Sequence, residues 1–554
     1  LQRFLRHGIG LHHAGLLPKY RRLVERLSQT GRLRVISGTD TLGVGVNIPI
    51  RTVLFTQLCK FNGEKVAVLS VRDFQQIAGR AGRKGFDAEG SVAAQAPEHV
   101  IENLKLAQKE AAGKKKAVKK QPPTKGYAHW DRNTFDRLRT GTPEPLESRF
   151  GVTHGMLLSV LQSSTHGYRR LVELVGRSHG SDWTRKRHLR AAAQAFRVLR
   201  GAGVIEVLRG HPATVRVSEE LQRDFSLHQT LSLYLLDTLE RLDPTGETYA
   251  LDVLTLVESI LENPDVVLYA QLNYLKGVKV AELKAQGMEY EERMAELEKL
   301  EWPKPNREFV YDTFNAFSHR HPWVGQENIR PKSVARELLE RFVSFNDYVR
   351  EYGLERSEGV LLRYLSEAYR TLTQTVPEAF RTEEVEDVIA FLRALVRQVD
   401  SSLLDEWEAL QHPEALLERP AQAPVAPPAW ARTLSPKELA ARVRAELHRL
   451  VGALAEKRYA DAVAMLHADE AWTAERLEAE MAPYWAEHAS VDLTPRARRP
   501  TLTFLREVES RQWEARQTLL DPEGHGDWMV DAFLDLREAR GMELPKLSLR
   551  RIGV

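Results

Sequence analysis

Two arginines three residues apart stand in a short stretch that is rich in glycine. Residues 75–85 read QQIAGRAGRKG, and the arginines are Arg80 and Arg83. Glycine lets a backbone approach a ligand closely, and the planar guanidinium of arginine matches phosphate oxygens. The stretch therefore predicts a phosphate-contacting loop. The chain has no G-x-x-x-x-G-K-[ST] sequence, the loop that cradles nucleotide phosphates through its backbone, so these arginines need another explanation.

Two other stretches share this character. Residues 10–25 read GLHHAGLLPKYRRLVE, residues 35–49 read VISGTDTLGVGVNIP, and residues 74–90, which include the arginines, read FQQIAGRAGRKGFDAEG. Each is expected at a strand–loop or loop–helix junction that is rich in glycine and hydroxyl side chains. Such junctions present backbone N–H groups and helix N-termini to anions.

In this order and spacing, the three stretches resemble the second RecA-like domain of superfamily 2 helicases. More narrowly, they resemble the superkiller (Ski-like) branch, which includes exosome-type RNA helicases. SGTDTLGVGVNIP is similar to motif V, QQIAGRAGRKG is similar to motif VI, and HHAGL is a signature of the branch. CKFNGEKVAVLSVRDF and PLESRFGVTHGMLLSVL are similar to segments of the exosome-type members. The resemblance covers roughly residues 1–412, and the tail is similar only to uncharacterised extensions of some bacterial helicases of this branch.

In these helicases ATP lies in a cleft between two RecA-like domains, and the resemblance implies a role for each matching residue. Arg80 and Arg83 would be catalytic arginine fingers that face the γ-phosphate. The residues nearest the nucleotide would be Gln76, Gly79, Gly45 and Asn47. The residues that hold the nucleic acid would be Thr39, Ser37 and His13. ATP and Mg²⁺ are the implied cofactors, and the Mg²⁺ ligands are expected in the first RecA-like domain, so no metal ligand is predicted in this chain.

That first domain is missing from the sequence, which begins at Leu1 and not at a methionine. We therefore expect the C-terminal part of a longer ATP-dependent helicase, inactive in ATP hydrolysis by itself. Its expected partner is single-stranded nucleic acid, with RNA favoured over DNA because of CKFNGEKV and PLESRF. The loop around Phe61 to Leu69 is a candidate strand-separating hairpin. The alternative is a non-catalytic nucleic-acid-binding or adaptor protein that acts with a partner.

Bulk composition is typical of a globular protein of several domains. Of the 554 residues, 43% are hydrophobic and 28% are charged, with a net charge of +3. A single cysteine, Cys59, excludes an intrachain disulfide framework and fits a reducing cytoplasm. The start, LQRFLRHG, has no apolar signal-peptide core, and no run of about 18 apolar residues occurs, so the expected location is cytoplasmic, without a membrane span.

The expected fold class is an α/β RecA-like domain, then a winged helix and a mainly α helical bundle, and then a small α+β C-terminal domain. The winged helix follows from TRKRHLRAAAQAFRVLRGAGVIEVLRG and TVRVS, which predict a helix, a glycine turn and two strands. The C-terminal domain could be cone-shaped, of the nuclear-transport-factor kind. The predicted parts are 1–103 (RecA-like), 104–144 (basic linker), 145–222 (winged-helix region), 223–412 (helical bundle), 413–436 (proline-rich linker) and 437–554 (α+β domain).

Helical periodicity places two amphipathic helices. YRRLVERLSQTG predicts a helix with Leu23, Val24 and Leu27 on one side and Gly31 at its end. SPKEL predicts a helix start in which Ser435 and Glu438 form a capping box. The apolar face that follows it is Leu439, Val443, Leu447, Leu450 and Leu454. The last ~55 residues then predict four strands with the turn DPEGHGD between two of them.

Several other features have competing interpretations. DEAW at 469–472 is similar to a Mg²⁺-binding DEAD/DEAH box, but it follows motif VI and lies in a helical, acidic segment, so we reject that role. Adjacent histidines such as His12 and His13 rarely bind one metal ion. The aromatic residues Trp130, Phe135 and Phe150 are expected to pack rather than stack on bases. The residues Asp521, Glu523, His525 and Asp527 are expected to form a polar turn. The eight lysines between Lys105 and Lys125 fit either a solvated linker or a phosphate-contacting arm.

Overall fold

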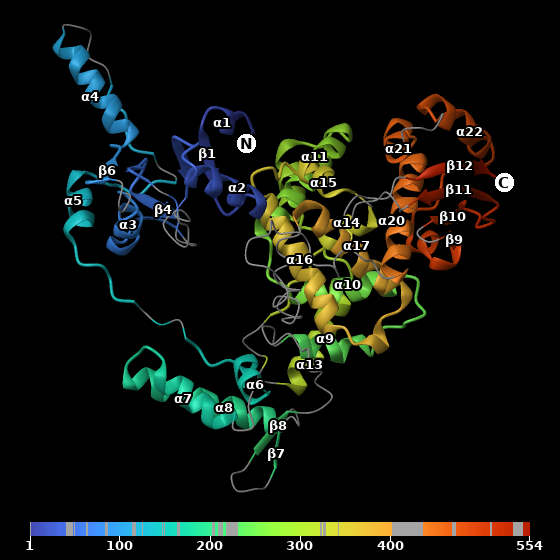
Figure 1. Ribbon diagram of the computed structural model, residues 1–554, viewed down its shortest axis with the longest axis horizontal. Coiled ribbons are helices and arrows are strands. Elements are labelled where there is room, and N and C mark those ends of the chain that lie inside the picture. The colour runs from blue at the N-terminus through green and yellow to red at the C-terminus, as the bar shows by residue number, and fades with distance from the viewer. Residues whose placement is uncertain are drawn as a thin grey trace. The chain divides into compact units, whose positions relative to one another are not determined.

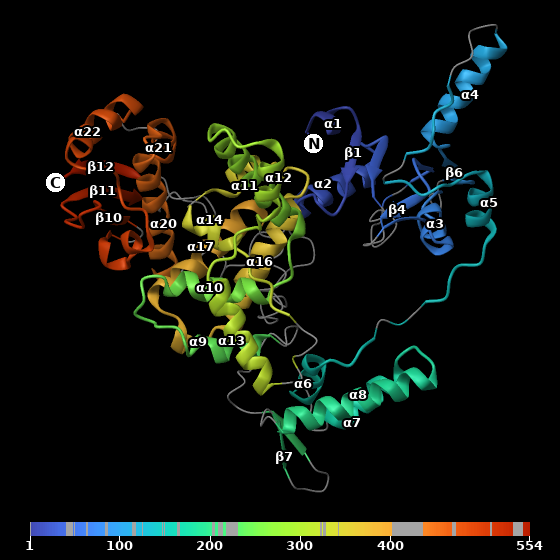
Figure 2. The same cartoon turned by 180° about the vertical axis from the view of Figure 1, so that it is seen from behind.

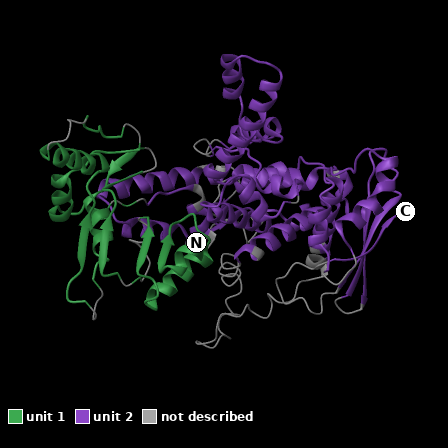
Figure 3. Cartoon of the chain, turned by 90° about the horizontal axis from the view of Figure 1, so that it is seen from above, with its two compact units in different colours: residues 1–149 green, residues 150–554 purple. Residues whose placement is uncertain are grey.

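The computed structural model divides the chain into two compact units, residues 1–149 and residues 150–554 (Figure 3). The residues that it describes are 2–39, 48, 50–61, 65–82, 87–112, 118–123, 126–146, 148, 150–162, 167–201, 205–208, 214–217, 231–321, 324, 328–341, 343–400, 436–467, 472–509, 512–535 and 547–554. Among them, no helix combines the length and the apolar character needed to cross a membrane.

The first unit alternates short strands and helices, as expected for an α/β fold (Figure 1). Its elements in chain order are α1 (Gln2–Arg6), β1 (Ile9–His12), α2 (Pro18–Gln29), β2 (Val35–Gly38), β3 (Thr52–Phe55), β4 (Cys59–Phe61), β5 (Val66–Val68), α3 (Val71–Ala78), β6 (Ser91–Ala94), α4 (Glu98–Ala111) and α5 (Arg132–Thr140). β1 pairs with β2 and β3 pairs with β6, both in parallel, whereas β4 and β5 form an antiparallel hairpin. The parallel pairs are the basis of the α/β class.

The helix α2 packs closely on β1 and ends as predicted. Val24 is fully buried, and a side chain on Gly10 of β1 would lie 2.9 Å from the Val24 side chain. Gly31, with a φ of +71°, follows the helix end. The predicted apolar side was wrong at Leu23, which is 41% exposed. Neighbouring positions on a helix differ by about 100°, so Leu23 points away from the strand that buries Val24.

The helix α5 belongs to the first unit, although it lies in a segment that the sequence analysis describes as linker. Trp130 and Leu138 are buried in one cluster with residues of β3 and α3, and Phe135 packs edge-on against Phe74. The Glu144 carboxylate accepts hydrogen bonds of 2.9 Å from the N–H groups of Val71 and Arg72, the first two residues of α3. Packing, and not base stacking, is thus the role of Trp130 and Phe135, as predicted.

The second unit begins with three helices and a two-stranded antiparallel ladder. These elements are α6 (His154–Gln162), α7 (Gly167–Arg177), α8 (Asp182–Gly201), β7 (Ile205–Leu208) and β8 (Thr214–Val217). Leu157 and Leu161 of α6, Leu171 of α7 and Leu199 of α8 share one buried core. The helix and the two strands that the sequence predicts over 185–217 are therefore present.

The following part is helical, as predicted. Its helices are α9 (Ser232–Leu239), α10 (Tyr249–Ile260), α11 (Asp265–Ala285), α12 (Tyr290–Glu298), α13 (Arg307–Arg320), α14 (Ala335–Glu340), α15 (Phe345–Glu351), α16 (Glu358–Thr375), η3 (Glu378–Phe380) and α17 (Glu383–Asp400). A buried carboxylate joins three of them. Glu258 of α10 accepts hydrogen bonds from the N–H groups of Val334, Ala335 and Arg336 at the start of α14, and from the Tyr364 hydroxyl of α16. A carboxylate at a helix N-terminus is stabilised by the N–H groups that lack partners there.

The C-terminal part packs three helices against one face of a four-stranded antiparallel sheet (Figures 1 and 2). Its elements are α20 (Pro436–Ala455), α21 (Tyr459–Met465), α22 (Ala474–Glu487), η5 (Pro495–Arg498), η6 (Pro500–Leu502), β9 (Thr503–Glu509), β10 (Gln512–Leu519), β11 (Trp528–Asp535) and β12 (Ser548–Gly553). The strand order is β12-β11-β10-β9, so the four predicted strands form a meander. The sheet is small and the domain is α+β, as predicted.

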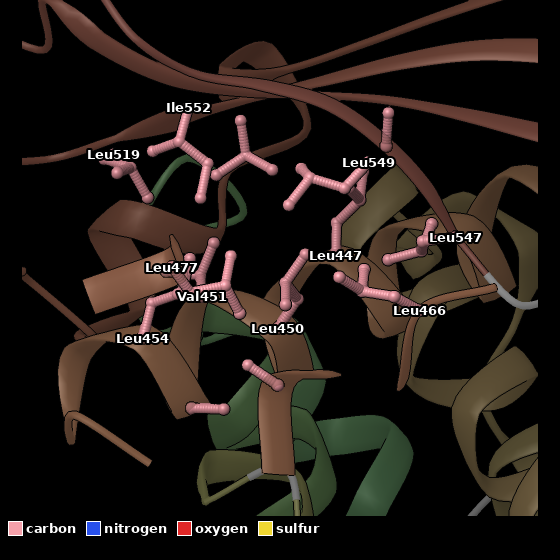
Figure 4. Packing of buried hydrophobic residues seen from close by; sticks show 14 of the residues in the cluster. Leu447, Leu450, Val451, Leu454, Leu466, Leu477, Leu519, Leu547, Leu549 and Ile552 are labelled. Atoms are coloured by element: carbon pink, nitrogen blue, oxygen red, sulfur yellow. The ribbon is translucent and has the colours of Figure 1, made fainter. Parts of the chain in front are cut away.

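The predicted apolar face of α20 forms the centre of this core. Val443, Leu447, Leu450 and Leu454 are all fully buried. Figure 4 shows Leu447, Leu450 and Leu454 on the helix side of the core and Leu549 and Ile552 on the sheet side. The side chain of Leu439 and the proposed cap Ser435 lie outside the described residues, as do the proline-rich segment and Asp469.

Buried charges also attach α20 to α17. The Arg444 guanidinium binds both carboxylate oxygens of Asp387, at 2.7 Å and 2.5 Å, and it lies 3.1 Å from the Glu383 carboxylate. Burial raises the pKa of Asp387 to about 6, against the opposing effect of Arg444. Two-point arginine–carboxylate pairs fix orientation as well as distance, so this pair sets how α20 lies on α17.

His448, one turn after Arg444, is buried between charged neighbours. The pKa of His448 is lowered from 6.5 to about 3, chiefly by burial and in addition by the nearby Arg498 and Arg444, against a hydrogen bond with Gln517. Its folded-state pKa therefore lies below its unfolded value. A group of this kind stabilises the fold fully above the unfolded pKa, and that stability is lost as pH falls from 6.5 towards 3.

We predict that replacing His448 reduces the acid sensitivity of the second unit. As the pH falls from about 7.5 to about 5, His448 should lower the free energy of unfolding by about 2 kcal/mol. In the His448→Gln variant, the loss of unfolding free energy between the two pH values should be markedly smaller. The His319→Gln variant, which changes an exposed histidine, should lose as much as the unmodified chain. Thermal unfolding of the full chain at both pH values measures the effect, and equal pH dependence in His448→Gln and the unmodified chain would contradict the assignment.

Candidate nucleotide and nucleic-acid site

The carboxyl ends of β1 and β2 form one edge that carries the predicted strand-binding residues. The parallel register pairs His12 with Gly38, and the Thr39 N–H donates to the His12 carbonyl at 3.3 Å. Because parallel strands end at the same side of a sheet, His13 and Thr39 leave their strands next to each other. Ser37 and Thr39 are exposed and His13 is half-buried. Three of the predicted residues are thus brought together at one edge.

The two adjacent histidines have different environments. His12 is buried, and its Nε2 lies 3.0 Å from Oε1 of Glu25 on α2. Burial lowers the pKa of His13, and the nearby His12 and Arg21 lower it further. His13 is therefore neutral at pH 7 and can exchange hydrogen bonds with a ligand. Glu25 is not recognisable as a partner of His12 from the sequence, because the two residues meet only once α2 is folded against β1.

The arginine-bearing loop follows α3 directly. Ser70 caps the start of this helix by accepting from the Asp73 N–H, and its last turn closes with a 2.7 Å bond from the Gly79 N–H to the Gln75 carbonyl. The chain then forms a parallel bridge between Ile50 and Ala81, and the Gly82 N–H donates to the Ile50 carbonyl at 2.8 Å. Residues 81–82, within the stretch similar to motif VI, are therefore attached to Ile50, which directly follows the stretch similar to motif V.

The glutamines before the loop have separate roles. The Gln75 side chain donates to the Gly141 carbonyl at 2.9 Å and so ties α3 to the end of α5. Gln76 is exposed, as is Gly79, while Arg80 is half-buried. Gln76 and Gly79 are therefore accessible to a ligand. The glutamine that makes a structural contact is Gln75, for which the sequence predicts no role.

Two glycines of this region are required by the backbone itself. Gly82 has a φ of +93°, a conformation that other residues rarely adopt. A side chain on Gly90 would lie 2.4 Å from the Ala81 backbone. These glycines allow residues 81–82 and Gly90 to pack together, so their presence has a structural reason apart from any ligand.

The predicted site is only partly described. Arg80, Gln76, Gly79, Thr39, Ser37 and His13 are described, whereas Arg83, Gly45 and Asn47 lie outside the described residues. The described residues form two groups, one at the β1–β2 edge and one at the end of α3. In each group side chains are accessible at a strand or helix end, whereas the N–H groups of Thr39 and of residues 79–82 are already bonded to carbonyls of the protein.

A separate cluster of candidate metal ligands lies in the C-terminal part, between the end of α22 and the turn that joins β10 to β11. Ligand atoms of His488, Asp521 and Glu523 lie within 4.8 Å of one another. The Asp521 carboxylate accepts from the N–H groups of Gly524, His525 and Gly526, which form the turn between β10 and β11. Burial acts to raise the pKa of Asp521, but these hydrogen bonds bring it well below its usual range. The structure thus supports the predicted polar turn.

The second unit also contains a cavity of about 760 Å³ beside α15, α20 and α21. Its charged lining is largely paired internally, as in the 2.7 Å contacts of Arg341 with Glu351 and of Arg458 with Asp461. Carboxylates and guanidinium groups are present in similar numbers, so the cavity does not favour one sign of ligand charge.

Comparison with known proteins defines the class of the first unit. Residues 1–85 match the helicase conserved C-terminal domain, which includes both groups of described site residues. Residues 96–552 match the family described as "Domain of unknown function (DUF3516)". Because this match covers most of the chain, the chain belongs to the DUF3516 family.

Individual relatives agree with the predicted helicase branch. The chain is 35% identical over 162 residues to the DExH-box ATP-dependent RNA helicase DExH11 of Arabidopsis thaliana, and 34% identical over 158 residues to the human exosome RNA helicase MTR4. It is 45% identical over 86 residues to the probable helicase HelY of Mycobacterium tuberculosis. These matches cover 29%, 28% and 16% of this chain, and 10%, 12% and 10% of the relatives. The resemblance to superkiller-branch helicases is confirmed, over a small part of each relative.

We predict that Gly90→Ala destabilises the first unit. The added methyl group would force the Ala81–Gly82 backbone away from Gly90, at a cost of about 1–3 kcal/mol. Thermal unfolding of the full chain should show a lower midpoint for the first unit. Gly151→Ala is the matched control, because a side chain there meets nothing within 4 Å. An unchanged first-unit midpoint in Gly90→Ala would contradict the close packing.

Proposed function

We propose that this chain supplies one half of the ATP cleft of a nucleic-acid helicase. The observation that carries the proposal is the position of Arg80. It follows α3 directly, in a loop attached to Ile50, within the segment that matches the helicase C-terminal domain. Arg80 and Arg83 would stabilise negative charge on the γ-phosphate during hydrolysis, and Gln76, Gly79, Gly45 and Asn47 would lie near the nucleotide. The phosphate loop and the Mg²⁺ ligands would come from another RecA-like domain.

The β1–β2 edge would hold the tracked strand. Exposed hydroxyl groups on Ser37 and Thr39, together with the uncharged ring of His13, can donate hydrogen bonds to phosphate oxygens without fixing a base sequence. RNA is the proposed substrate, since the named functions of DExH11 and MTR4 are those of RNA helicases. Closure of the two RecA-like domains on ATP would then move the strand.

The hairpin of β4 and β5 would separate paired strands. It lies between motifs V and VI, and Phe61 at the end of β4 is 64% exposed. A 3.1 Å ion pair from Lys60 to Asp73 of α3 ties the hairpin to the helix that precedes the arginines. An exposed aromatic ring can replace a base in a stack and so stabilise an opened end.

The elements after residue 150 complete the proposal. We interpret α6–α8 with β7 and β8 as a winged helix, because three helices followed by a two-stranded ladder is the order of elements in that module. We also keep the interpretation of residues 437–554 as a cone-shaped domain, supported by the three helices packed on one face of a meander.

We predict that Arg80→Ala or Arg83→Ala nearly abolishes RNA-stimulated ATP hydrolysis by the natural polypeptide that carries this chain. Loss of an arginine finger typically costs a factor of about 10³ or more. Binding of a single-stranded RNA should change little, and the exposed Arg26→Ala on α2 should hydrolyse ATP normally. Turnover near the unmodified rate in both finger variants would contradict the assignment. Absence of hydrolysis in the unmodified polypeptide would favour the adaptor alternative.

We predict that Phe61→Ala uncouples hydrolysis from strand separation. Unwinding of a short RNA duplex should fall by about tenfold, because the ring that replaces a base is lost. RNA-stimulated ATP hydrolysis should stay within about twofold of the unmodified rate. Exposed Phe504→Ala in the C-terminal sheet serves as the control. Parallel loss of both activities would show that Phe61 is needed for the fold or the cleft instead.

A further inference from the structure

The helix α8 carries a continuous basic face along its whole length. The side chains exposed on it are spaced three or four residues apart, as residues on one side of a helix are. They are Trp183, Lys186, Arg187, Arg190, Gln194, Arg197 and Arg200. Asp182 is the only acidic residue of the helix, and it lies at the first position. We call the exposed set the basic stripe.

The opposite side of α8 is fixed in a core. Ala192, Ala195 and Leu199 are buried against α6, and buried His188 packs edge-on against Phe150. The helix α7 lies beside α8 (Figures 1 and 2). The basic stripe is therefore presented by a helix whose rotation is set by packing.

Within the part of the chain that the structure describes, the charges of the basic stripe are not neutralised by acidic side chains. Asp182 pairs with Arg185, which is not in the stripe. Arg197 donates to the Ala193 carbonyl of its own helix, and Arg187 lies over the Trp183 ring at 5.2 Å. Among the described residues, Lys186, Arg190, Arg197 and Arg200 have no carboxylate within ion-pair distance. These four cations, with no described carboxylate beside them, repel one another, and a polyanion would relieve that repulsion.

The length of the basic stripe and the aromatic ring at its end indicate which kind of polyanion it binds. At 1.5 Å per residue the stripe spans about 25 Å, which matches several successive phosphates of one strand. Trp183 is 68% exposed at one end of the stripe. A flat ring beside phosphate-binding cations is the arrangement that binds an unpaired base together with its backbone. A duplex would leave this ring without a base to stack on.

We propose that the basic stripe of α8 binds a single-stranded nucleic-acid segment, with Lys186, Arg187, Arg190, Arg197 and Arg200 on phosphates and Trp183 on a base. This surface belongs to the second unit, whereas the β1–β2 edge belongs to the first. The choice of nucleic acid rests on the proposed function, whereas the location rests on α8 alone. It gives the chain a contact with the strand that does not depend on ATP.

The test measures binding of the full chain to a fluorescein-labelled ~20-nucleotide oligouridine, without ATP, over a range of KCl concentrations. The triple variant Arg190→Gln, Arg197→Gln and Arg200→Gln should bind at least about tenfold more weakly near 0.1 M salt. The slope of log affinity against log salt should fall by about 2, because each phosphate contact on a single strand contributes about 0.7. Trp183→Ala should weaken binding about fivefold or more while the slope is retained.

The control is Arg506→Gln, Arg516→Gln and Arg550→Gln in the C-terminal sheet, which removes the same charge from side chains that are ion-paired. It should bind as the unmodified chain does. Equal binding by the stripe variant and the unmodified chain would overturn the inference and leave the proposed function standing. No binding by the unmodified chain would also overturn the inference, whereas the proposed function is tested separately by ATP hydrolysis of the natural polypeptide.

Two further results would also overturn the inference. One is tighter binding of a blunt duplex than of the single strand through the same arginines. The other is stripe-dependent binding of polyglutamate in place of RNA, which would make the surface a site for an acidic protein. Equal unfolding midpoints of all variants show that the fold is intact.

Discussion

The position of the arginine loop depends on one close contact between backbone segments. Gly90 lies against the Ala81 backbone with no room for a side chain, and Gly82 adopts a left-handed conformation beside it. This packing lets Ala81 bridge to Ile50, which follows motif V. A loop held only by side chains would let a guanidinium move by more than the ångström or so that a transition state tolerates. Here the backbone itself fixes Arg80 relative to the sheet.

The arginines of this protein lie in three different kinds of surroundings. Arg444 is buried with both oxygens of Asp387 and joins two helices. Arg80 is half-buried at the end of α3, beside exposed Gln76 and Gly79. The arginines of the α8 stripe are exposed on one face, with no carboxylate of the described residues at ion-pair distance. A buried pair makes structure, whereas cations without acids favour a charged ligand.

Local sequence patterns predicted much of the fold. The period of Val443, Leu447, Leu450 and Leu454 identified the buried face of α20, because each lies about one turn from the next. The same reasoning failed for Leu23, because the spacing of apolar residues along α2 does not show which side of the helix meets β1. The helix α5 was missed, although Asp131 and Thr134 form a capping box at its start. That local signal could have identified it.

Long-range contacts explain what the sequence did not reveal. Glu258 receives its hydrogen bonds from residues at least 76 positions away, and Gln75 reaches Gly141 across 66. No periodicity links such residues before the chain is folded. The site residues were identified by resemblance to a helicase branch, which the comparisons confirm for that part of the chain. Their roles at a nucleotide remain proposals that depend on chemistry in the cleft.

The most direct test is a structure of the natural polypeptide with single-stranded RNA, ADP and aluminium fluoride, which mimics the transferring phosphoryl group. Our account predicts the guanidinium groups of Arg80 and Arg83 within about 3 Å of the fluoride ligands. It also predicts Thr39 within hydrogen-bond distance of an RNA phosphate. A nucleotide bound with neither arginine at its phosphates would contradict the proposal that this chain completes an ATP cleft.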